Sequence, residues 1–169
     1  FLDLVTASGI ESGFQRVTEY LDEIPDDAGV LVIRGDMPLF EGDTLLKLAG
    51  QHRLTDTDIT ILTVRQGEAG VGLPVSRRNG RILGISSELN KVSPHGSEEL
   101  AVGVYATDAR GITAGLRNSG TTAAHNFTVG MAALSYEAAD SIVDAFQISE
   151  SSEIESIRDR ISLASLNAK

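Results

Sequence analysis

The sequence predicts a single mixed α/β domain with a mainly parallel sheet, helices on both faces and an inserted β-hairpin. Three observations support this prediction. Apolar, β-branched runs alternate with stretches whose apolar residues recur at helical spacing. Asn79-Gly80 is a strong signal for a two-residue hairpin turn. The chain has 169 residues, 41% of them hydrophobic, which is enough for one compact core.

The first third of the chain alternates strands and helices. A short strand is expected at 1–5, followed by a helix at 12–24 with an apolar stripe at helical spacing. Residues 29–33 form a continuous apolar run, which is typical of a strand buried on both faces of a parallel sheet. Another buried strand is expected at 58–64. The pattern therefore predicts β-α-β-α-β crossovers onto a parallel sheet.

A helix at 44–52 is expected between those two buried strands. Asp43 is a suitable N-cap because its carboxylate can accept hydrogen bonds from the free N–H groups of the first turn. Four apolar side chains of this helix should face the sheet, namely Leu45, Leu46, Leu48 and Ala49.

The middle of the chain changes character. Strands at 73–77 and 81–85 flank Arg78-Asn79-Gly80, and a polar loop follows at 86–97. The remaining expected elements are a strand at 100–106, helices at 108–116 and 123–138, a strand at 141–148 and a helix at 152–166 with Ser151 or Ser152 as its cap. The acidic, serine-rich stretch 149–156 fits the start of this last helix, where negative charge is favourable.

Composition disfavours several classes of partner and chemistry. The formal net charge of -10 repels the phosphates of nucleic acids and anionic lipids. The absence of cysteine excludes disulfides, thiolate metal sites and cysteine nucleophiles. No apolar run approaches the roughly 18–20 residues that a transmembrane helix needs. We therefore expect a cytoplasmic protein with neither nucleic acid nor membrane as partner. A bound triphosphate would require a divalent cation with basic or backbone N–H groups.

The motif with the most chemical content is Gly35-Asp36-Met37-Pro38-Leu39, directly after the apolar run at 29–33. In open α/β sheets, ligands bind beyond the carboxyl ends of the strands, where Asp36 is expected. Mg²⁺ prefers one or two carboxylates together with phosphate oxygens and water, so Asp36 is a candidate ligand. The alternative is a turn aspartate that accepts hydrogen bonds from nearby N–H groups.

The order of the motifs resembles the nucleotidyltransferase domain of bacterial N-acetylglucosamine-1-phosphate uridyltransferases. Gly70-Val71-Gly72 falls where that family has Gly-Tyr-Gly, and residues 99–105 fall on Glu-Val-Asn-x-Gly-Val-Tyr. Residues 156–164 fall on Gly-Val-Asn-Asn-Arg-x-x-Leu-Ala, where the family's closing helical arm begins. The resemblance covers 2–169 and implies a GT-A-like, Rossmann-like nucleotidyltransferase fold. It also implies one domain over 1–169, with 152–169 as the arm.

The resemblance implies an activity: Mg²⁺-dependent transfer of UMP from UTP to a sugar-1-phosphate, with release of pyrophosphate. It assigns Asp36 to the metal and the backbone N–H of Gly72 to the sugar. Glu88 is the substitute for a sugar-binding glutamate, and Asp159 is the second candidate metal ligand. Gly13 lies in the segment that replaces the family's uracil-reading loop and is a candidate substrate contact. No residue is assigned as a catalytic acid, base or nucleophile, and a homo-oligomer is an open expectation.

This chain departs from the family pattern at positions that would contact ligands. It starts downstream of the glycine-rich loop that cradles the triphosphate in the family. Val71 replaces the tyrosine of Gly-Tyr-Gly, Ala101 a sugar-binding asparagine, and Arg158 a metal-binding asparagine. Each hydrogen-bond partner removed costs about 1–3 kcal/mol of binding. The sequence thus leaves three functions open: a uridyltransferase of this type, a nucleotidyltransferase for another base or acceptor, and a non-catalytic binding, regulatory or scaffold module.

Other polar residues are expected to be structural. The three histidines lie far apart in the sequence, with no acid or nucleophile at a diagnostic spacing. Arg77, Arg78 and Arg81 cluster on the predicted hairpin. We expect a solvated hairpin tip there, with a phosphate contact as the alternative.

Overall fold

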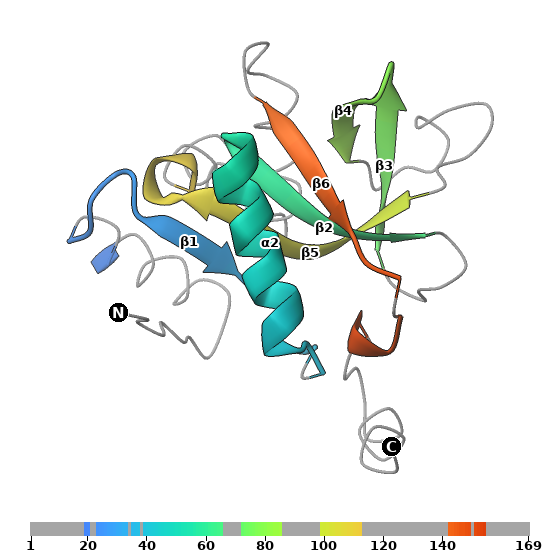
Figure 1. Cartoon of the computed structure of the whole chain (residues 1–169), viewed down its shortest axis with the longest axis horizontal. Coiled ribbons are helices and arrows are strands. Elements are labelled where there is room, and N and C mark those ends of the chain that lie inside the picture. The colour runs from blue at the N-terminus through green and yellow to red at the C-terminus, as the bar shows by residue number, and fades with distance from the viewer. Residues whose placement is uncertain are drawn as a thin grey trace.

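The computed structural model describes residues 19–20, 23–33, 35–37, 39–65, 72–85, 99–112, 142–149 and 151–154, without the side chains of residues 78, 83, 84, 151 and 152 (Figure 1). The described elements are β1 (Gly29–Val32), α2 (Gly42–Thr55), β2 (Ile59–Arg65), β3 (Leu73–Arg78), β4 (Arg81–Ile85), β5 (Glu99–Asp108), β6 (Val143–Gln147) and the 3₁₀ turn η3 (Ser151–Ile154). They have the predicted mixed α/β character. No described helix is long and apolar enough to cross a membrane.

One sheet contains all six described strands. Its order is β4-β3-β5-β2-β6, and β1 also pairs with β5. The ten-residue β5 organises the sheet, because β2 pairs along one of its edges while β3 and β1 share the other. On that shared edge, β3 pairs near the start of β5 and β1 near its end.

The expectation of a mainly parallel sheet is wrong for the described pairings. Among them, only β2 and β6 pair in parallel, whereas β5 runs antiparallel to β1, β2 and β3. The predicted crossover is present, since β1 and β2 run in the same direction and α2 connects them. However, β5 lies between the two strands. A continuous apolar run reports burial on both faces of a sheet, and it carries no information about the direction of the neighbouring strand.

The core lies on both faces of the sheet. Alternate residues of β2 serve opposite faces, so that Ile59 and Ile61 join one apolar cluster while Leu62 and Val64 join the other. The first cluster includes Tyr105 and the hairpin residues. The second includes Leu48 of α2, which lies across that face of the sheet (Figure 1).

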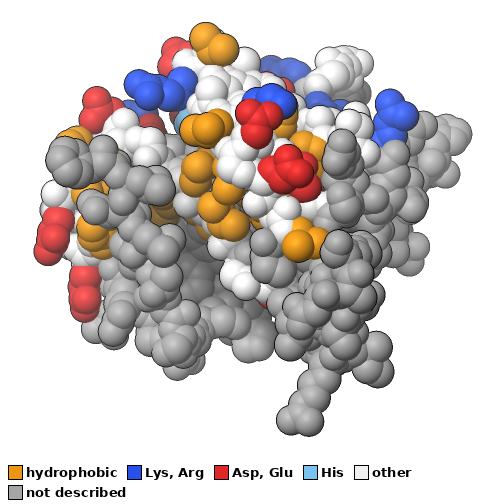
Figure 2. Space-filling model, turned by 60° about the horizontal axis from the view of Figure 1, so that its bottom comes forward, with side chains coloured by type: hydrophobic (Ala, Val, Ile, Leu, Met, Phe, Trp, Pro, Cys, Tyr) orange, Lys and Arg blue, Asp and Glu red, His pale blue; other side chains and the backbone are white. Residues whose placement is uncertain are grey.

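Helix α2 starts earlier and ends later than predicted. Its N-cap is Glu41, so Asp43 lies inside the first turn instead of capping it. Leu48 is fully buried, but Leu46 is 74% exposed and does not face the sheet. Successive helical residues are about 100° apart, so Leu46 lies nearly opposite Thr44 and Leu48. Figure 2 shows hydrophobic side chains among acidic and basic ones on one face of the molecule.

The predicted hairpin is confirmed. Asn79 and Gly80 connect β3 to β4 with φ values of 52° and 81°. Positive φ at both central residues is what a type I′ turn requires. The helix predicted from residue 108 begins as a helical turn at 109–112. Asp108 caps it by accepting a hydrogen bond from the N–H of Gly111 at 2.6 Å.

Several expected elements fall wholly or largely outside the described residues. These are the strand at 1–5, most of the helix at 12–24, the loop at 86–97, the helix at 123–138 and the helix at 152–166 beyond η3. Two described residues of the second segment, Glu19 and Tyr20, are helical.

Candidate functional site

Asp36 lies in a turn just beyond the carboxyl end of β1, where the sequence places it. Its side chain is half-buried, while Gly35 beside it is exposed. Met37, the next residue, is buried. The structure thus presents a partly accessible carboxylate beyond a strand end, and its role as a metal ligand remains a prediction.

Gly72 is required for packing. A Cβ at this position would lie 2.8 Å from Cβ of Leu100 and 3.2 Å from the carbonyl oxygen of Ala101. Both neighbours belong to β5. Leu73, the residue after Gly72, pairs with Ala101 of that strand. Glycine therefore lets the start of β3 approach β5 closely. A backbone contact from Gly72 to a sugar is a separate prediction.

The two candidate positions approach the same edge of β5. Strand β1 ends opposite Tyr105, and β3 begins opposite Ala101. The end of β1, four residues before Asp36, and the start of β3, next to Gly72, therefore approach the short stretch 102–104 from opposite ends. Sheet topology thus brings the ends of two strands that are distant in sequence to one edge of β5.

That stretch of β5 is irregular. Ile61 pairs with Tyr105 and Thr63 with Ala101, so the register between β2 and β5 shifts there. Gly103 has a φ of 83°, a conformation that glycine adopts without strain. Bulges of this kind are frequent next to active sites, because they interrupt the ladder and redirect side chains.

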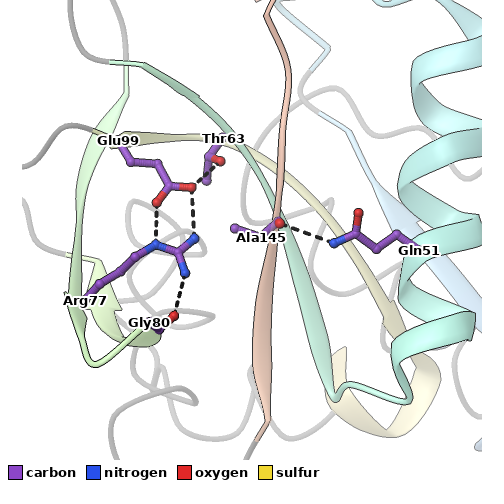
Figure 3. Close-up of polar contacts among 6 residues, drawn as sticks. All are labelled: Gln51, Thr63, Arg77, Gly80, Glu99 and Ala145. Carbon is purple, nitrogen blue, oxygen red and sulfur yellow. Dashed lines mark hydrogen bonds and ion pairs between the residues drawn. The ribbon is translucent and has the colours of Figure 1, made fainter.

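Arg77 and Glu99 form an ion pair that joins the hairpin to the sheet (Figure 3). Nε of Arg77 donates to Oε2 of Glu99 at 2.6 Å, and Nη2 donates to Oε1 at 3.0 Å. Oε1 also accepts a hydrogen bond from Oγ1 of Thr63 at 2.6 Å, and Nη1 of Arg77 donates to the carbonyl of Gly80 at 2.9 Å. Arg77 is exposed at the hairpin, as expected for a solvated tip, but its guanidinium is held by Glu99 and by the carbonyl of Gly80.

The electrostatics of this pair follow from its partial burial. The side chain of Glu99 is 12% exposed and that of Arg77 is 35% exposed. Burial alone would raise the pKa of Glu99, but the hydrogen bonds from Arg77 and Thr63 lower it overall. The hydrogen bond to Glu99 raises the pKa of Arg77. Sequence reasoning missed the pair because its residues lie 22 positions apart in an arrangement that only the sheet creates.

A second missed residue is Glu153, at the N-terminus of α2. Its Oε2 accepts a hydrogen bond from the backbone N–H of Glu41 at 3.1 Å, and its Oε1 accepts one from Oγ1 of Thr44 at 3.0 Å. The sequence signal for such a cap is an acid three residues after the N-cap, but Thr44 occupies that position. The acidic pattern of 149–156 by itself indicates only the start of its own helix.

His52 belongs to a polar network at the end of α2. Its Nδ1 lies 3.1 Å from Oγ1 of Thr60 and 3.3 Å from Oγ1 of Thr57. Burial lowers the pKa of His52, so the neutral ring is favoured. The expected structural role of this histidine fits these contacts.

No group of three or more His, Cys, Asp or Glu side chains that could hold a metal ion occurs among the described residues. Gly13, Glu88 and Asp159 lie outside them, so the structure does not place these three candidates. Of the predicted site residues it places Asp36 and Gly72.

Comparison with known proteins agrees with the fold. No protein-family model matches the chain. A bifunctional protein GlmU of Pelotomaculum thermopropionicum is 33% identical over 141 residues, which are 80% of this chain and 30% of that protein. A bifunctional protein GlmU of Mycobacterium leprae is 28% identical over 156 residues, 88% of this chain and 31% of that protein. The chain thus spans slightly under a third of these relatives.

Two solved structures share the fold. One is described as a glucose-1-phosphate thymidylyltransferase of Bacillus anthracis in complex with sucrose. It matches with a TM-score of 0.63 at 13% identity, over 91% of this chain and 58% of that chain. The other is a CMP:2-keto-3-deoxy-manno-octonic acid synthetase with bound CTP, with a TM-score of 0.53 at 15% identity, over 82% and 60% of the two chains. The chain is a relative of the GlmU proteins with a nucleotidyltransferase fold.

Proposed function

We propose that the chain forms part of an enzyme that transfers a nucleotidyl group from a nucleoside triphosphate to a sugar-1-phosphate. UTP is the proposed donor and N-acetylglucosamine-1-phosphate the proposed acceptor. The observation that carries the proposal is the partly accessible Asp36 turn just beyond β1, a strand that pairs with the irregular β5, in a chain of nucleotidyltransferase fold. A cytoplasmic location and a homo-oligomeric assembly belong to the same proposal.

The described residues fit a Mg²⁺ ion shared with a nucleotide better than one enclosed by protein ligands. Asp36 is a single half-buried carboxylate, and the described residues contain no cluster of three acidic or histidine ligands. Mg²⁺ commonly takes one or two carboxylates and completes its octahedron with phosphate oxygens and water. The ion would neutralise charge on the phosphates as pyrophosphate leaves. Asp36 would hold it, with Asp159 as the second proposed ligand.

The remaining proposed roles concern alignment. An oxygen of the sugar phosphate attacks the α-phosphorus while the bond to pyrophosphate breaks, so no protein nucleophile is needed. The backbone of Gly72, held against β5, would contact the sugar, and Glu88 and Gly13 complete the proposed substrate contacts. Arg77 is paired with Glu99 and is not proposed as a phosphate ligand.

One observation favours the second candidate, a binding or scaffold module without catalysis. Ala101, which replaces the family's sugar-binding asparagine, is 1% exposed and pairs with Leu73 and Thr63 within the sheet. Its methyl group offers no hydrogen bond to a sugar. A nucleotidyltransferase that takes another base or acceptor remains the third candidate for the same reason.

Thermal unfolding of the full chain with UTP, CTP, GTP and dTTP, each with Mg²⁺, separates the candidates. A nucleotide present at 100 times its Kd stabilises a protein by about 2.7 kcal/mol, which is a shift of about 5–11 °C for a domain of this size. A shift with UTP alone, together with pyrophosphate release when sugar-1-phosphate is added, supports the proposal. Preference for another nucleotide supports the third candidate. No shift with any nucleotide contradicts both enzyme proposals.

The metal role of Asp36 has a matched control. Asp36→Asn should weaken Mg²⁺-dependent nucleotide binding at least about tenfold. Asp43→Asn should leave binding unchanged, because Asp43 is an exposed residue on α2 that pairs with Lys47. Equal binding by both variants would remove Asp36 from the proposed metal site.

A further inference from the structure

A short backbone ladder joins the β3–β4 hairpin to the rest of the sheet. Among the described pairings, Leu73 and Pro74 are the residues of β3 that pair with β5, opposite Ala101 and Leu100. Proline has no N–H, so Pro74 cannot donate a hydrogen bond to this ladder. From Val75 onward, β3 pairs with β4 instead. The backbone attachment of the hairpin is therefore confined to its first two residues.

The side chain of Arg77 supplies a second attachment, next to the hairpin turn (Figure 3). Its Nε and Nη2 donate to the two carboxylate oxygens of Glu99, and its Nη1 donates to the carbonyl of Gly80 in the turn. Glu99 is the first residue of β5, and its Oε1 also accepts a hydrogen bond from Thr63 of β2. A planar guanidinium that binds both oxygens of a carboxylate fixes orientation as well as distance. One side chain thus connects the hairpin turn to two strands of the sheet.

Partial burial distinguishes this ion pair from an ordinary surface pair. Exposed ion pairs contribute little because water and salt screen them. The side chain of Glu99 is mostly buried, so its carboxylate would be costly without the hydrogen bonds that it accepts. The hairpin also packs on the sheet through Val75, Ile82 and Ile85, which share one apolar cluster with Ala101. Packing holds the body of the hairpin, and the ion pair holds the part next to the turn.

The ion pair and Gly72 contact consecutive residues of β5. An added Cβ at Gly72, directly before β3, would lie 2.8 Å from Cβ of Leu100, and Arg77 binds Glu99, the residue before Leu100. Because β3 runs as one strand between these two contacts, a rotation of the hairpin about its short ladder displaces both against the start of β5.

We propose that Arg77 and Glu99 are positioning residues, which hold the hairpin in one orientation on the sheet and so fix the backbone of Gly72 for the acceptor sugar phosphate. The acceptor contact of Gly72 rests on the proposed function, whereas the orientation of the hairpin does not.

A double-mutant cycle separates the ion pair from its two members. Arg77→Gln and Glu99→Gln each break the pair, and the double variant removes both charges. Arg110→Gln is the matched control, because it removes an arginine from a more exposed ion pair, with Asp108, elsewhere in the fold. Thermal unfolding without ligand identifies any variant that fails to fold. The double variant leaves neither charge of the pair without its partner, so it replaces a single variant that unfolds.

The orientation of the hairpin is measured with two spin labels on the full chain. The chain contains no cysteine, so labels at Arg81→Cys on the hairpin and Leu54→Cys on α2 report one distance without background. Both residues are exposed, so the labels disturb little packing. The distance distribution should be narrow in the otherwise unchanged protein and in Arg110→Gln. It should broaden or shift in Arg77→Gln, in Glu99→Gln and in the double variant.

Ligand affinity is measured by isothermal titration calorimetry, separately for N-acetylglucosamine-1-phosphate and for UTP with Mg²⁺. The Kd of the sugar phosphate should rise about fivefold or more in each single variant, while the Kd of UTP stays within about twofold. The double variant should lose no more than the larger single loss, because the two residues act as a pair. A general loss of structure would weaken the binding of both ligands alike.

Either readout can overturn the positioning role. An unchanged distance distribution in both single variants shows that the ion pair does not orient the hairpin, and additive losses in the double variant show that its members act separately. A changed distribution with an unchanged Kd for the sugar phosphate overturns the link to Gly72. If the unchanged protein binds neither ligand, the proposed function fails and the acceptor contact of Gly72 with it. The label distances then still decide whether Arg77 and Glu99 orient the hairpin.

Discussion

Gly72→Ala tests whether close packing against β5 explains the glycine before β3. The new Cβ would lie 2.8 Å from Cβ of Leu100, a distance that real Cβ atoms essentially never show, and 3.2 Å from the carbonyl oxygen of Ala101. Neither atom is the far end of a flexible side chain. Relief therefore requires β5 or β3 to shift, and overpacking of this kind costs about 1–3 kcal/mol.

The expected loss of stability is large enough to measure. For a domain of 150–250 residues, each kcal/mol corresponds to about 2–4 °C in Tm, so Gly72→Ala should lower Tm by about 2–12 °C. Urea unfolding should show a lower midpoint with an unchanged slope if the native fold is retained. Calorimetry and circular dichroism provide independent midpoints.

Gly50→Ala is the matched control with the opposite sign. Gly50 lies inside α2, where an added Cβ would meet nothing within 4 Å. Alanine is favoured over glycine in a helix interior by about 0.5–1 kcal/mol, so this variant should be more stable than the wild type. If Gly72→Ala is as stable as the wild type while Gly50→Ala behaves as expected, the packing explanation of Gly72 is refuted.

Two further predictions concern the pair with Arg77 and the orientation of α2. Burial opposes ionisation of Glu99, but hydrogen bonds from Arg77 and Thr63 lower its pKa below the ordinary 4.5. The ionised Glu99 therefore stabilises the fold above pH 4.5, and this stabilisation is lost as the pH falls through the pKa of Glu99 in the folded protein. Glu99→Gln should therefore flatten the decline in unfolding free energy below about pH 4.5, and an unchanged acid limb would contradict this. Leu48→Ala should cost about 2–5 kcal/mol because Leu48 is fully buried, whereas Leu46→Ala should change stability by less than about 0.5 kcal/mol; equal losses in urea unfolding would contradict the orientation of α2.

Local patterns identified most of the described elements. The apolar run at 29–33 and the strand at 58–64 correspond to β1 and β2 with ends shifted by one residue, and Asn79-Gly80 forms the expected turn. These features depend on side chains close in sequence, which is why spacing and turn chemistry reveal them. The predicted bounds of α2 are less accurate. The helix begins after Glu41, whose backbone N–H is bound by Glu153, a residue far away in the sequence.

The candidate site was only partly predictable. The sequence placed Asp36 beyond a strand end, and the structure has it there. The sequence did not reveal that β3, which follows Gly72, pairs with the same edge of β5 as β1. It also did not reveal that Arg77 is paired with Glu99. Both facts arise from pairing across the sheet, for which a single sequence contains no local signal.

The sequence by itself determined the α/β class, the hairpin and the resemblance to sugar-phosphate nucleotidyltransferases, because each depends on residue types at short or fixed spacing. Only the tertiary structure decided that β5 runs antiparallel between β1 and β2, and that Glu153 caps α2. Strand direction and long-range capping depend on which distant segments meet. Burial then decides which of these contacts are stable, because a carboxylate or a backbone N–H that leaves water must find a hydrogen-bond partner.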